Sequence, residues 1–60
     1  MTLGKQVKKA REDKRLTQDE LKTMAKISLD TLCRVEQDRA NPTLYVITQL
    51  QKVLEVKFDI

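Results

Sequence analysis

Four side chains that can form hydrogen bonds, those of Asp30, Cys33, Arg34 and Gln37, recur at the spacing of one helix face. At about 100° per residue they fall within an arc of roughly 100° on one side of a helix. A guanidinium can pair with guanine, a carboxylate can accept from the amino group of cytosine, and an amide can pair with adenine. The segment therefore predicts a face able to read base edges, and the alternative is an ordinary solvated helix face.

The other side of the same helix, expected over about residues 28–37, is apolar. Leu32 and Val35 share the inward stripe, and Leu29 at its edge could either finish the core or meet a thymine methyl group. Glu36 falls within this stripe, where a lone carboxylate is costly unless it is paired. Arg11, at the edge of the inward face of the first helix, is the best partner by periodicity, so we predict a structural ion pair of Arg11 and Glu36. The alternative for Arg11 is one more surface base.

Helical spacing of apolar residues runs through every segment, and runs of β-branched residues between turn residues are absent. The predicted fold is therefore all-α, with four to five short helices. Thr2 is placed to cap a first helix that ends near Lys14, Thr17 and Glu20 form a capping box, and Ser28 can cap the third helix. The residues that mark the first, second and fourth helices are Leu3, Val7, Ala10, Leu21, Ala25, Leu44, Ile47, Leu50 and Leu54.

The second and third helices are short and separated by only about three residues, 25–27, so they must cross steeply. Two short helices joined by a tight turn, here about residues 17–37, form a helix-turn-helix that can push its second helix into a groove about 12 Å wide. The turn-forming residues Asn41-Pro42-Thr43 separate the third helix from the fourth. Residues 58–60 either dock as a tail or begin a fifth helix.

Composition limits the class of protein. Sixty residues make one domain, 1–60, without room for a separate effector domain, so no small-molecule ligand is expected. One cysteine and no histidine exclude a disulfide framework and a metal site, and the chain lacks the residue groups of an enzyme site, so no cofactor and no enzymatic activity are expected. The longest apolar run is only 44–47, which argues against a membrane span or signal peptide, and the free Cys33 suits a reducing cytoplasm.

Charge is uneven along the chain. The net charge is +3, and residues 1–15 hold six bases against two acids, which gives +4. Residues 16–41 hold four bases against five acids, which gives −1. A basic first helix usually forms only a solvated face, although the overall balance leans toward polyanions. The acidic tilt of the middle segment supports a rival function, a protein-binding module of the antitoxin or antirepressor type.

Taken together, these residues resemble the helix-turn-helix domain of the phage repressor, Cro and xenobiotic-response-element family, whose fold is lambda-repressor-like. The resemblance is gapless from Leu3 to about Ile60. The motifs that carry it are Leu3-Gly4, Arg11, Leu16-Thr17-Gln18, Leu21, Ile27-Ser28, Leu32, Val35-Glu36, Asn41-Pro42, Thr43-Leu44, Val53-Leu54, Val56 and Asp59.

The resemblance implies roles for individual positions. Leu29, Asp30, Cys33 and Arg34 match positions that touch base edges, which the helix geometry extends to Gln37. Thr17 and Gln18 match residues that contact phosphate or brace the recognition helix. Further matches to positions near backbone phosphates are Ser28, Thr31, Arg39 and Asn41.

Three departures from the family pattern concern packing and turns. Lys22 stands where the family usually has alanine, and Lys26 and Asp38 stand at common glycine positions. A non-glycine residue in the left-handed region costs about 1 to 2 kcal/mol, so these residues bear on the geometry of the turn.

Together these features predict a sequence-specific transcriptional repressor that binds a roughly two-fold symmetric double-stranded DNA operator as a homodimer. A chain of this size has marginal stability, and dimerisation would support it. Tyr45, Val46 and Phe58 are candidates for the dimer interface, since the 44–47 run and the tail are more apolar than one buried stripe requires. The alternative is that these residues merely close a small core.

Overall fold

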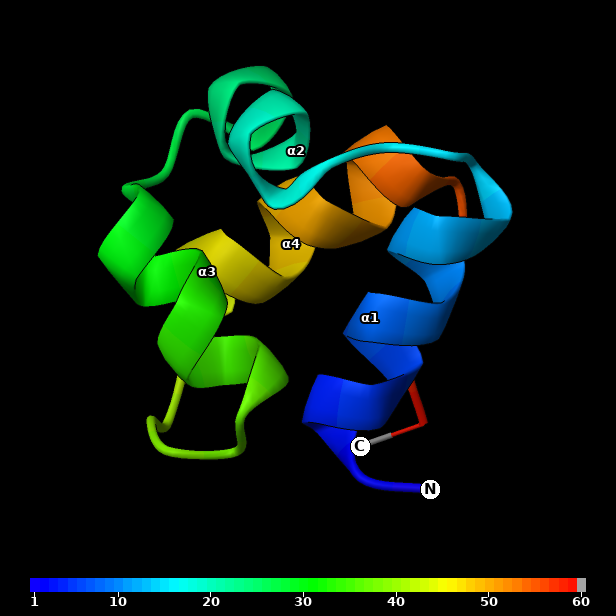
Figure 1. Cartoon of the computed structure of the whole chain (residues 1–60). Coiled ribbons are helices and arrows are strands. Elements are labelled where there is room, and N and C mark those ends of the chain that lie inside the picture. The colour runs from blue at the N-terminus through cyan, green and yellow to red at the C-terminus, as the bar shows by residue number, and fades with distance from the viewer. Residues whose placement is uncertain (60) are drawn as a thin grey trace.

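The computed structural model describes residues 1–59, which form four helices joined by short turns and contain no strand (Figure 1). The predicted all-α, lambda-repressor-like fold is confirmed. The helices are α1 (Leu3–Asp13), α2 (Gln18–Ala25), α3 (Leu29–Glu36) and α4 (Leu44–Leu54). Phe58 and Asp59 lie in a non-helical tail, while Ile60 is outside the described residues.

Each helix begins at a hydroxyl side chain that accepts a hydrogen bond from the amide three residues later. The four caps are Thr2, Thr17, Ser28 and Thr43. These bonds span 3.0 to 3.2 Å and satisfy an amide that the helix itself leaves without an acceptor. At Thr17 the predicted capping box is complete, because the Glu20 carboxylate accepts from the Thr17 amide at 2.9 Å.

Each helix is also followed, within two residues of its end, by a residue with positive φ, although none is glycine. Within residues 1–59 these are Arg15, Lys26, Asp38 and Glu55, with φ of 57° or 58°. In every case the next amide donates back to a carbonyl five residues earlier, at 2.9 to 3.3 Å, as in a Schellman motif. The turn after α2 therefore keeps its geometry with Lys26 in the left-handed conformation, and the protein bears the associated strain four times.

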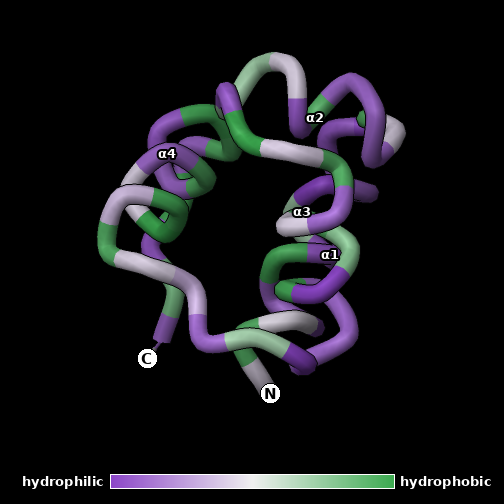
Figure 2. Tube along the Cα trace, turned by 90° about the vertical axis from the view of Figure 1, so that its left-hand side faces the viewer, coloured by the Kyte–Doolittle hydropathy of each residue, from purple (hydrophilic) through white to green (hydrophobic). Residues whose placement is uncertain are grey.

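A single apolar core joins all four helices and the tail (Figure 2, in which apolar stretches of α1 and α4 turn toward the interior). Its buried members are Val7, Leu21, Ala25, Leu32, Val35, Val46, Leu50, Leu54 and Phe58. The tail is fixed by amide side chains: Gln51 accepts from the Phe58 amide at 3.0 Å, and Gln6 exchanges two hydrogen bonds with the Asp59 backbone at 2.7 and 2.9 Å.

Two of the three candidate dimer residues lie in this core, so for them the interface assignment is wrong and the alternative, that they close a small core, is confirmed. Val46 and Phe58 retain only 8% and 9% exposure. Val46 closes the core because the register of α4 turns it inward with Leu50 and Leu54, and Phe58 packs on the same core from the tail. The same register leaves Leu44, which marked α4 in the sequence, 79% exposed, and Tyr45 57% exposed.

Candidate nucleic-acid interface

The helix-turn-helix is formed by α2, the turn at residues 26–28, and α3. In Figure 1, α2 is seen nearly end-on while α3 runs down the left side of the molecule, so the two helices cross steeply. Lys26 turns the chain, and Ser28 starts α3 only three residues after Ala25 ends α2. Lys22, in place of the usual alanine, fits by lying at the surface, with its side chain 34% exposed and its ammonium 3.9 Å from Asp19.

The two faces of α3 differ as the periodicity predicts. Leu32 and Val35 are buried, whereas Asp30, Arg34 and Gln37 are exposed. Arg34 Nε lies 3.1 Å from Asp30 Oδ2, and the two side chains are 61% and 73% exposed. This outward face therefore presents a guanidinium, a carboxylate and an amide to whatever approaches α3.

Leu29 and Cys33 lie at the margins of this face. Leu29, the first residue of α3, is 42% exposed, so it does not finish the core. Cys33 is half-buried, and its thiol donates to Gln18 Oε1 at 3.4 Å. Leu29 thus offers methyl groups to a neighbouring molecule, while Cys33 is held against α2.

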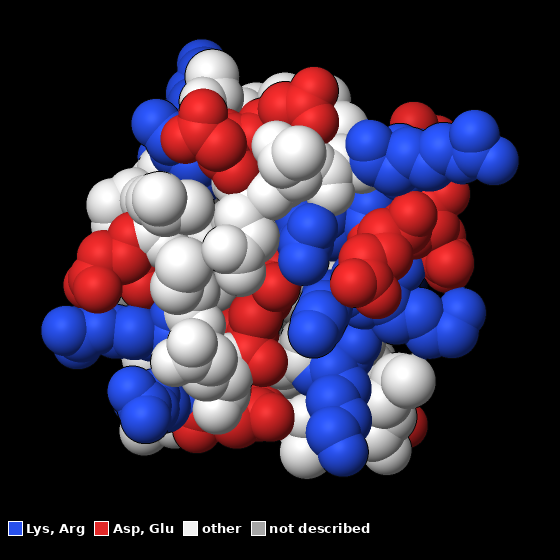
Figure 3. Space-filling model, viewed as in Figure 1, with Lys and Arg blue, Asp and Glu red and all other residues white. Residues whose placement is uncertain are grey.

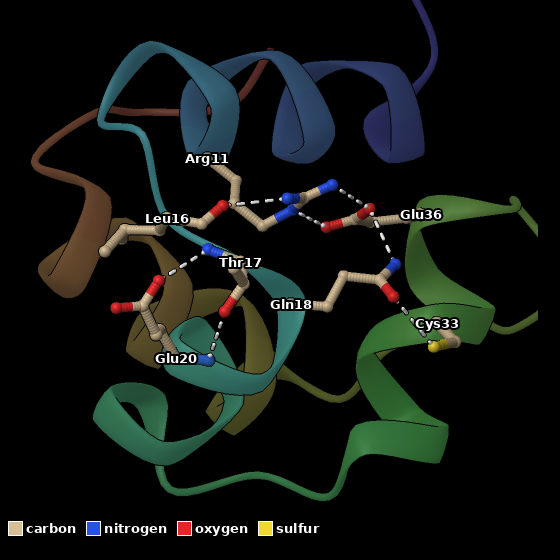
Figure 4. Close-up of polar contacts among 7 residues, drawn as sticks. All are labelled: Arg11, Leu16, Thr17, Gln18, Glu20, Cys33 and Glu36. Carbon is tan, nitrogen blue, oxygen red and sulfur yellow. Dashed lines mark hydrogen bonds and ion pairs between the residues drawn. The ribbon is translucent and has the colours of Figure 1, made fainter.

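A nearly buried polar cluster, made by Arg11, Gln18 and Glu36, joins α1, α2 and α3 behind the exposed face (Figure 4). Arg11 donates to both oxygens of Glu36, at 2.8 Å from Nε and 3.2 Å from Nη2, and to the Leu16 carbonyl at 2.8 Å. The Arg11 and Glu36 side chains are only 12% and 4% exposed. The hydrogen bond to Glu36 raises the pKa of Arg11 above its ordinary value, so the guanidinium stays charged.

Gln18 connects this cluster to the outward face. Its Nε2 donates to Glu36 Oε1 at 3.1 Å, and its Oε1 accepts from the Cys33 thiol. Through these two hydrogen bonds Gln18 joins the start of α2 to α3. The sequence pointed to Arg11 and Glu36, but it gave no signal for the Leu16 carbonyl as a third partner.

The residues matched to phosphate contacts lie at helix starts and in the loop after α3. Thr17 is exposed, and its backbone amide donates a hydrogen bond to the Glu20 carboxylate. Hydrogen bonding to Thr17, chiefly from this amide, lowers the pKa of Glu20. Ser28 donates its hydroxyl hydrogen to Thr31 Oγ1 at 2.7 Å. Arg39 and Asn41 are exposed in the loop that leaves the lower end of α3 in Figure 1.

The contact between the end of α3 and the start of α1 is not predicted by the sequence. Asp38 Oδ1 accepts from the Gly4 amide at 2.9 Å, and Asp38 Oδ2 accepts from the Thr2 hydroxyl at 2.7 Å. These two hydrogen bonds lower the pKa of Asp38. A Cβ on Gly4 would lie 2.5 Å from the Val35 carbonyl oxygen and 2.6 Å from that of Glu36. Gly4 therefore permits the close approach, and Asp38, at a position where glycine is common, caps α1.

Charge differs between the two sides of the molecule. Figure 3 shows many Lys and Arg residues over α1, with acidic residues among them, and a larger share of uncharged residues over α3. No helix within residues 1–59 is both long enough and apolar enough to cross a bilayer.

Comparisons with known proteins agree with this geometry. Residues 7–60 match the family model HTH_3, described as helix-turn-helix. The chain is 33% identical over 57 residues to the immunity repressor protein of Bacillus phage phi105, an alignment that covers 95% of this chain and 40% of the repressor. This chain therefore spans less than half the length of that relative.

One solved structure shows the same fold. The crystal structure of the restriction-modification controller protein C.AhdI from Aeromonas hydrophila superposes with a TM-score of 0.87 and 24% sequence identity. The match covers 92% of this chain and 83% of that one.

Proposed function

The chain belongs to the HTH_3 family of DNA-binding helix-turn-helix domains and not to a family of enzymes, and from that premise we propose that it is a sequence-specific transcriptional repressor. It binds an operator in double-stranded DNA by placing α3 in the major groove. Residues 1–60 act as one domain, in the cytoplasm where such an operator lies.

The observation that carries this proposal is the division of α3 into two faces. Its inner face is fixed by Leu32, Val35 and the nearly buried Glu36, while Asp30 and Arg34 remain exposed. A helix that reads bases needs both properties, because its side chains must be free and its backbone must be rigid. Leu29 adds an apolar contact suited to a thymine methyl group, and Gln37 adds an amide suited to adenine.

Phosphate contacts flank this face. Exposed Thr17 and Ser28 at two helix starts, with Arg39 and Asn41 after α3, are positioned to hold the DNA backbone. Gln18, Thr31 and Cys33 are half-buried and shape the same surface. Phosphate contacts set register and orientation, and base contacts specify sequence.

We also propose that the protein binds as a homodimer. With Val46 and Phe58 in the core, the dimer surface consists of exposed Leu44 and Tyr45 at the start of α4, which follows the loop after α3. A two-fold axis there would present two copies of α3 to half-sites about 34 Å apart. Sedimentation at tens of micromolar should show a dimer, and Leu44→Asp should shift it to monomer. A wild-type monomer, with and without DNA, would contradict the dimer.

DNA binding is tested by selecting bound oligonucleotides from a random pool. The wild type should enrich a roughly symmetric site, with binding that falls steeply as salt rises. Arg34→Ala should weaken binding to that site by about 1 to 3 kcal/mol and relax preference at one base pair. Lys52→Ala, at an exposed position on α4, is the matched control. Enrichment of no sequence would refute the proposal, and equal weakening on all sequences would make Arg34 a phosphate contact.

The rival function, a protein-binding module of the antitoxin or antirepressor type, rests on the charge of −1 over residues 16–41. It predicts a stoichiometric protein partner and no retained DNA in a pull-down. The pull-down therefore separates the two functions, because it shows whether DNA or a protein partner is retained.

A further inference from the structure

Asp30 and Arg34 form one ion pair on the exposed face of α3, and this pair, called the unit below, has its own pattern of donors and acceptors. We propose that the two side chains together read a single G·C base pair in each half-site, with guanine facing Arg34 and cytosine facing Asp30. This inference rests on the proposed function and assigns one base pair of the operator.

The ion pair determines which atoms remain free. Arg34 Nε lies 3.1 Å from Asp30 Oδ2, and neither side chain has another hydrogen-bond or ion-pair partner within residues 1–59. The guanidinium therefore keeps Nη1 and Nη2 as donors, and the carboxylate keeps Oδ1 as an acceptor. Seen from the groove, the unit offers two donors followed by one acceptor.

A G·C pair presents the complementary order in the major groove. Guanine offers N7 and O6 as acceptors, and the cytosine N4 amino group offers a donor. An A·T pair places a donor between two acceptors, and a C·G pair reverses the order. Only the G·C orientation therefore satisfies all three free groups of the unit.

Pairing also prepares Arg34 for this contact. Asp30 and Arg34 lie one helical turn apart, so their tips meet above the same part of α3. Holding the guanidinium before DNA arrives reduces the conformational entropy lost on binding. A lone carboxylate opposite acceptor edges would repel them, whereas Asp30 beside Arg34 has both a cation and an amino group to contact.

The inference differs from independent reading in one measurable way. If Asp30 and Arg34 read separate base pairs, their loss relaxes preference at separate positions. If they act as a unit, Arg34→Ala and Asp30→Asn relax preference at the same position. Asn is the conservative test at residue 30, because it keeps the shape and removes the charge.

The experiment selects DNA from a random pool with the wild type, Arg34→Ala, Asp30→Asn and the control Asp13→Asn. Asp13 forms a matched exposed pair with Lys9 on α1, at 3.2 Å and also four residues apart. Circular dichroism checks that each variant keeps its helices. We expect both α3 variants to lose preference at one shared G·C pair, with affinity reduced about 5- to 100-fold, and the control to keep the wild-type site.

Base analogues in the selected site then test each contact. Replacing that guanine by 7-deazaguanine removes N7 and should weaken the wild type about 5-fold or more, but not Arg34→Ala. Replacing the cytosine by 2-pyrimidinone removes the amino group and should weaken the wild type more than Asp30→Asn, because the neutral amide oxygen of Asn is a weaker acceptor than a carboxylate.

The possible outcomes distinguish a failure of this base-pair assignment from a failure of the proposed function. If the wild type enriches no DNA, the proposed function fails and the inference fails with it. If the wild type enriches a site but the two variants relax different base pairs, or the 2-pyrimidinone site binds as tightly as cytosine, the inference is overturned and the function stands.

Discussion

Helix α3 takes part in two arginine–carboxylate pairs of the same chemistry in opposite surroundings. Arg11 and Glu36 join α1 to α3 at 2.8 Å, and their side chains are 12% and 4% exposed. Arg34 and Asp30 lie within α3 at 3.1 Å, and their side chains are 61% and 73% exposed. Burial, and not the identity of the groups, decides what each pair can do.

The buried pair is costly to break, because removal of one partner leaves an uncompensated charge away from water. It is also reinforced, since the Leu16 carbonyl and the Gln18 amide supply further hydrogen bonds. An exposed pair contributes only about 0 to 1 kcal/mol to folding. Its remaining donors and acceptor can therefore contact DNA at little cost to folding.

The largest expected effect comes from breaking the buried pair. Glu36→Ala leaves the Arg11 guanidinium without its carboxylate and should lower the free energy of unfolding by about 3 to 5 kcal/mol. Urea denaturation followed by circular dichroism measures this loss. For a domain whose total stability is about 3 to 9 kcal/mol, the variant approaches the limit of folding.

A double variant keeps that test informative. Arg11→Met with Glu36→Leu removes both charges and should recover much of the loss, since buried pairs can often be replaced by apolar residues. Asp13→Asn, at an exposed pair, serves as the control and should change stability by less than about 0.5 kcal/mol. A cost below about 1 kcal/mol for Glu36→Ala would show that the buried pair behaves like the exposed one.

The next largest effect concerns the packing that brings Glu36 to α1. In most helices Gly→Ala stabilises by about 1 kcal/mol. Here the new Cβ would lie 2.5 Å and 2.6 Å from two carbonyl oxygens of α3, which are backbone atoms that cannot move aside singly. Gly4→Ala should therefore destabilise by about 1 to 3 kcal/mol, as measured by thermal unfolding. An increase in Tm would mean that α1 and α3 can move apart enough to fit the methyl group without loss of stability.

The sequence predicted the exposed pair's surroundings better than the junction between α1 and α3. Helical periodicity separates Leu32 from Arg34 because it needs only local geometry. The same reasoning placed Arg11 opposite Glu36, because a carboxylate in an apolar stripe demands a partner. Hydroxyl caps at Thr2, Thr17 and Ser28 were also visible, since a cap is a local signal.

Features that depend on several helices at once were not predictable. Gly4 and Asp38 meet only when α1 and α3 cross, 34 residues apart in the chain. Arg15 and Glu55 adopt positive φ in the turns after α1 and α4 without the glycine that usually marks such turns. Val46 and Phe58 were assigned to a partner surface because apolar residues show that burial is needed, but not which copy of the chain provides it.

Asp38 differs from the exposed Arg34–Asp30 pair, because it is an exposed carboxylate that stabilises the fold. Its pKa is lowered by hydrogen bonds from Thr2 and Gly4, so its contribution is fully present above the unfolded-state pKa of about 4. The contribution is lost as pH falls through the lower folded-state pKa. The Tm of the wild type should therefore fall more than that of Asp38→Asn between about pH 5 and pH 2.

Asn is the suitable replacement at residue 38, since it tolerates positive φ and keeps an acceptor for the Gly4 amide. The difference between the two titrations isolates this carboxylate from all others. Parallel curves would mean that Asp38 caps α1 no better as a charged group than as a neutral one.

The smallest expected effect on folding comes from removing the exposed pair of Arg34 and Asp30. This change tests most directly whether exposure separates the role of this pair from that of the buried pair. Arg34→Ala is preferable to a change at Asp30, because Asp30 also lies in the first turn of α3, where a negative charge favours the helix dipole. The free energy of unfolding should change by less than about 0.5 kcal/mol in urea, while affinity for the selected operator falls about 5- to 100-fold. A loss of stability above about 1.5 kcal/mol would make Arg34 part of the scaffold, and its weaker DNA binding would then report a disturbed α3 and not a lost base contact.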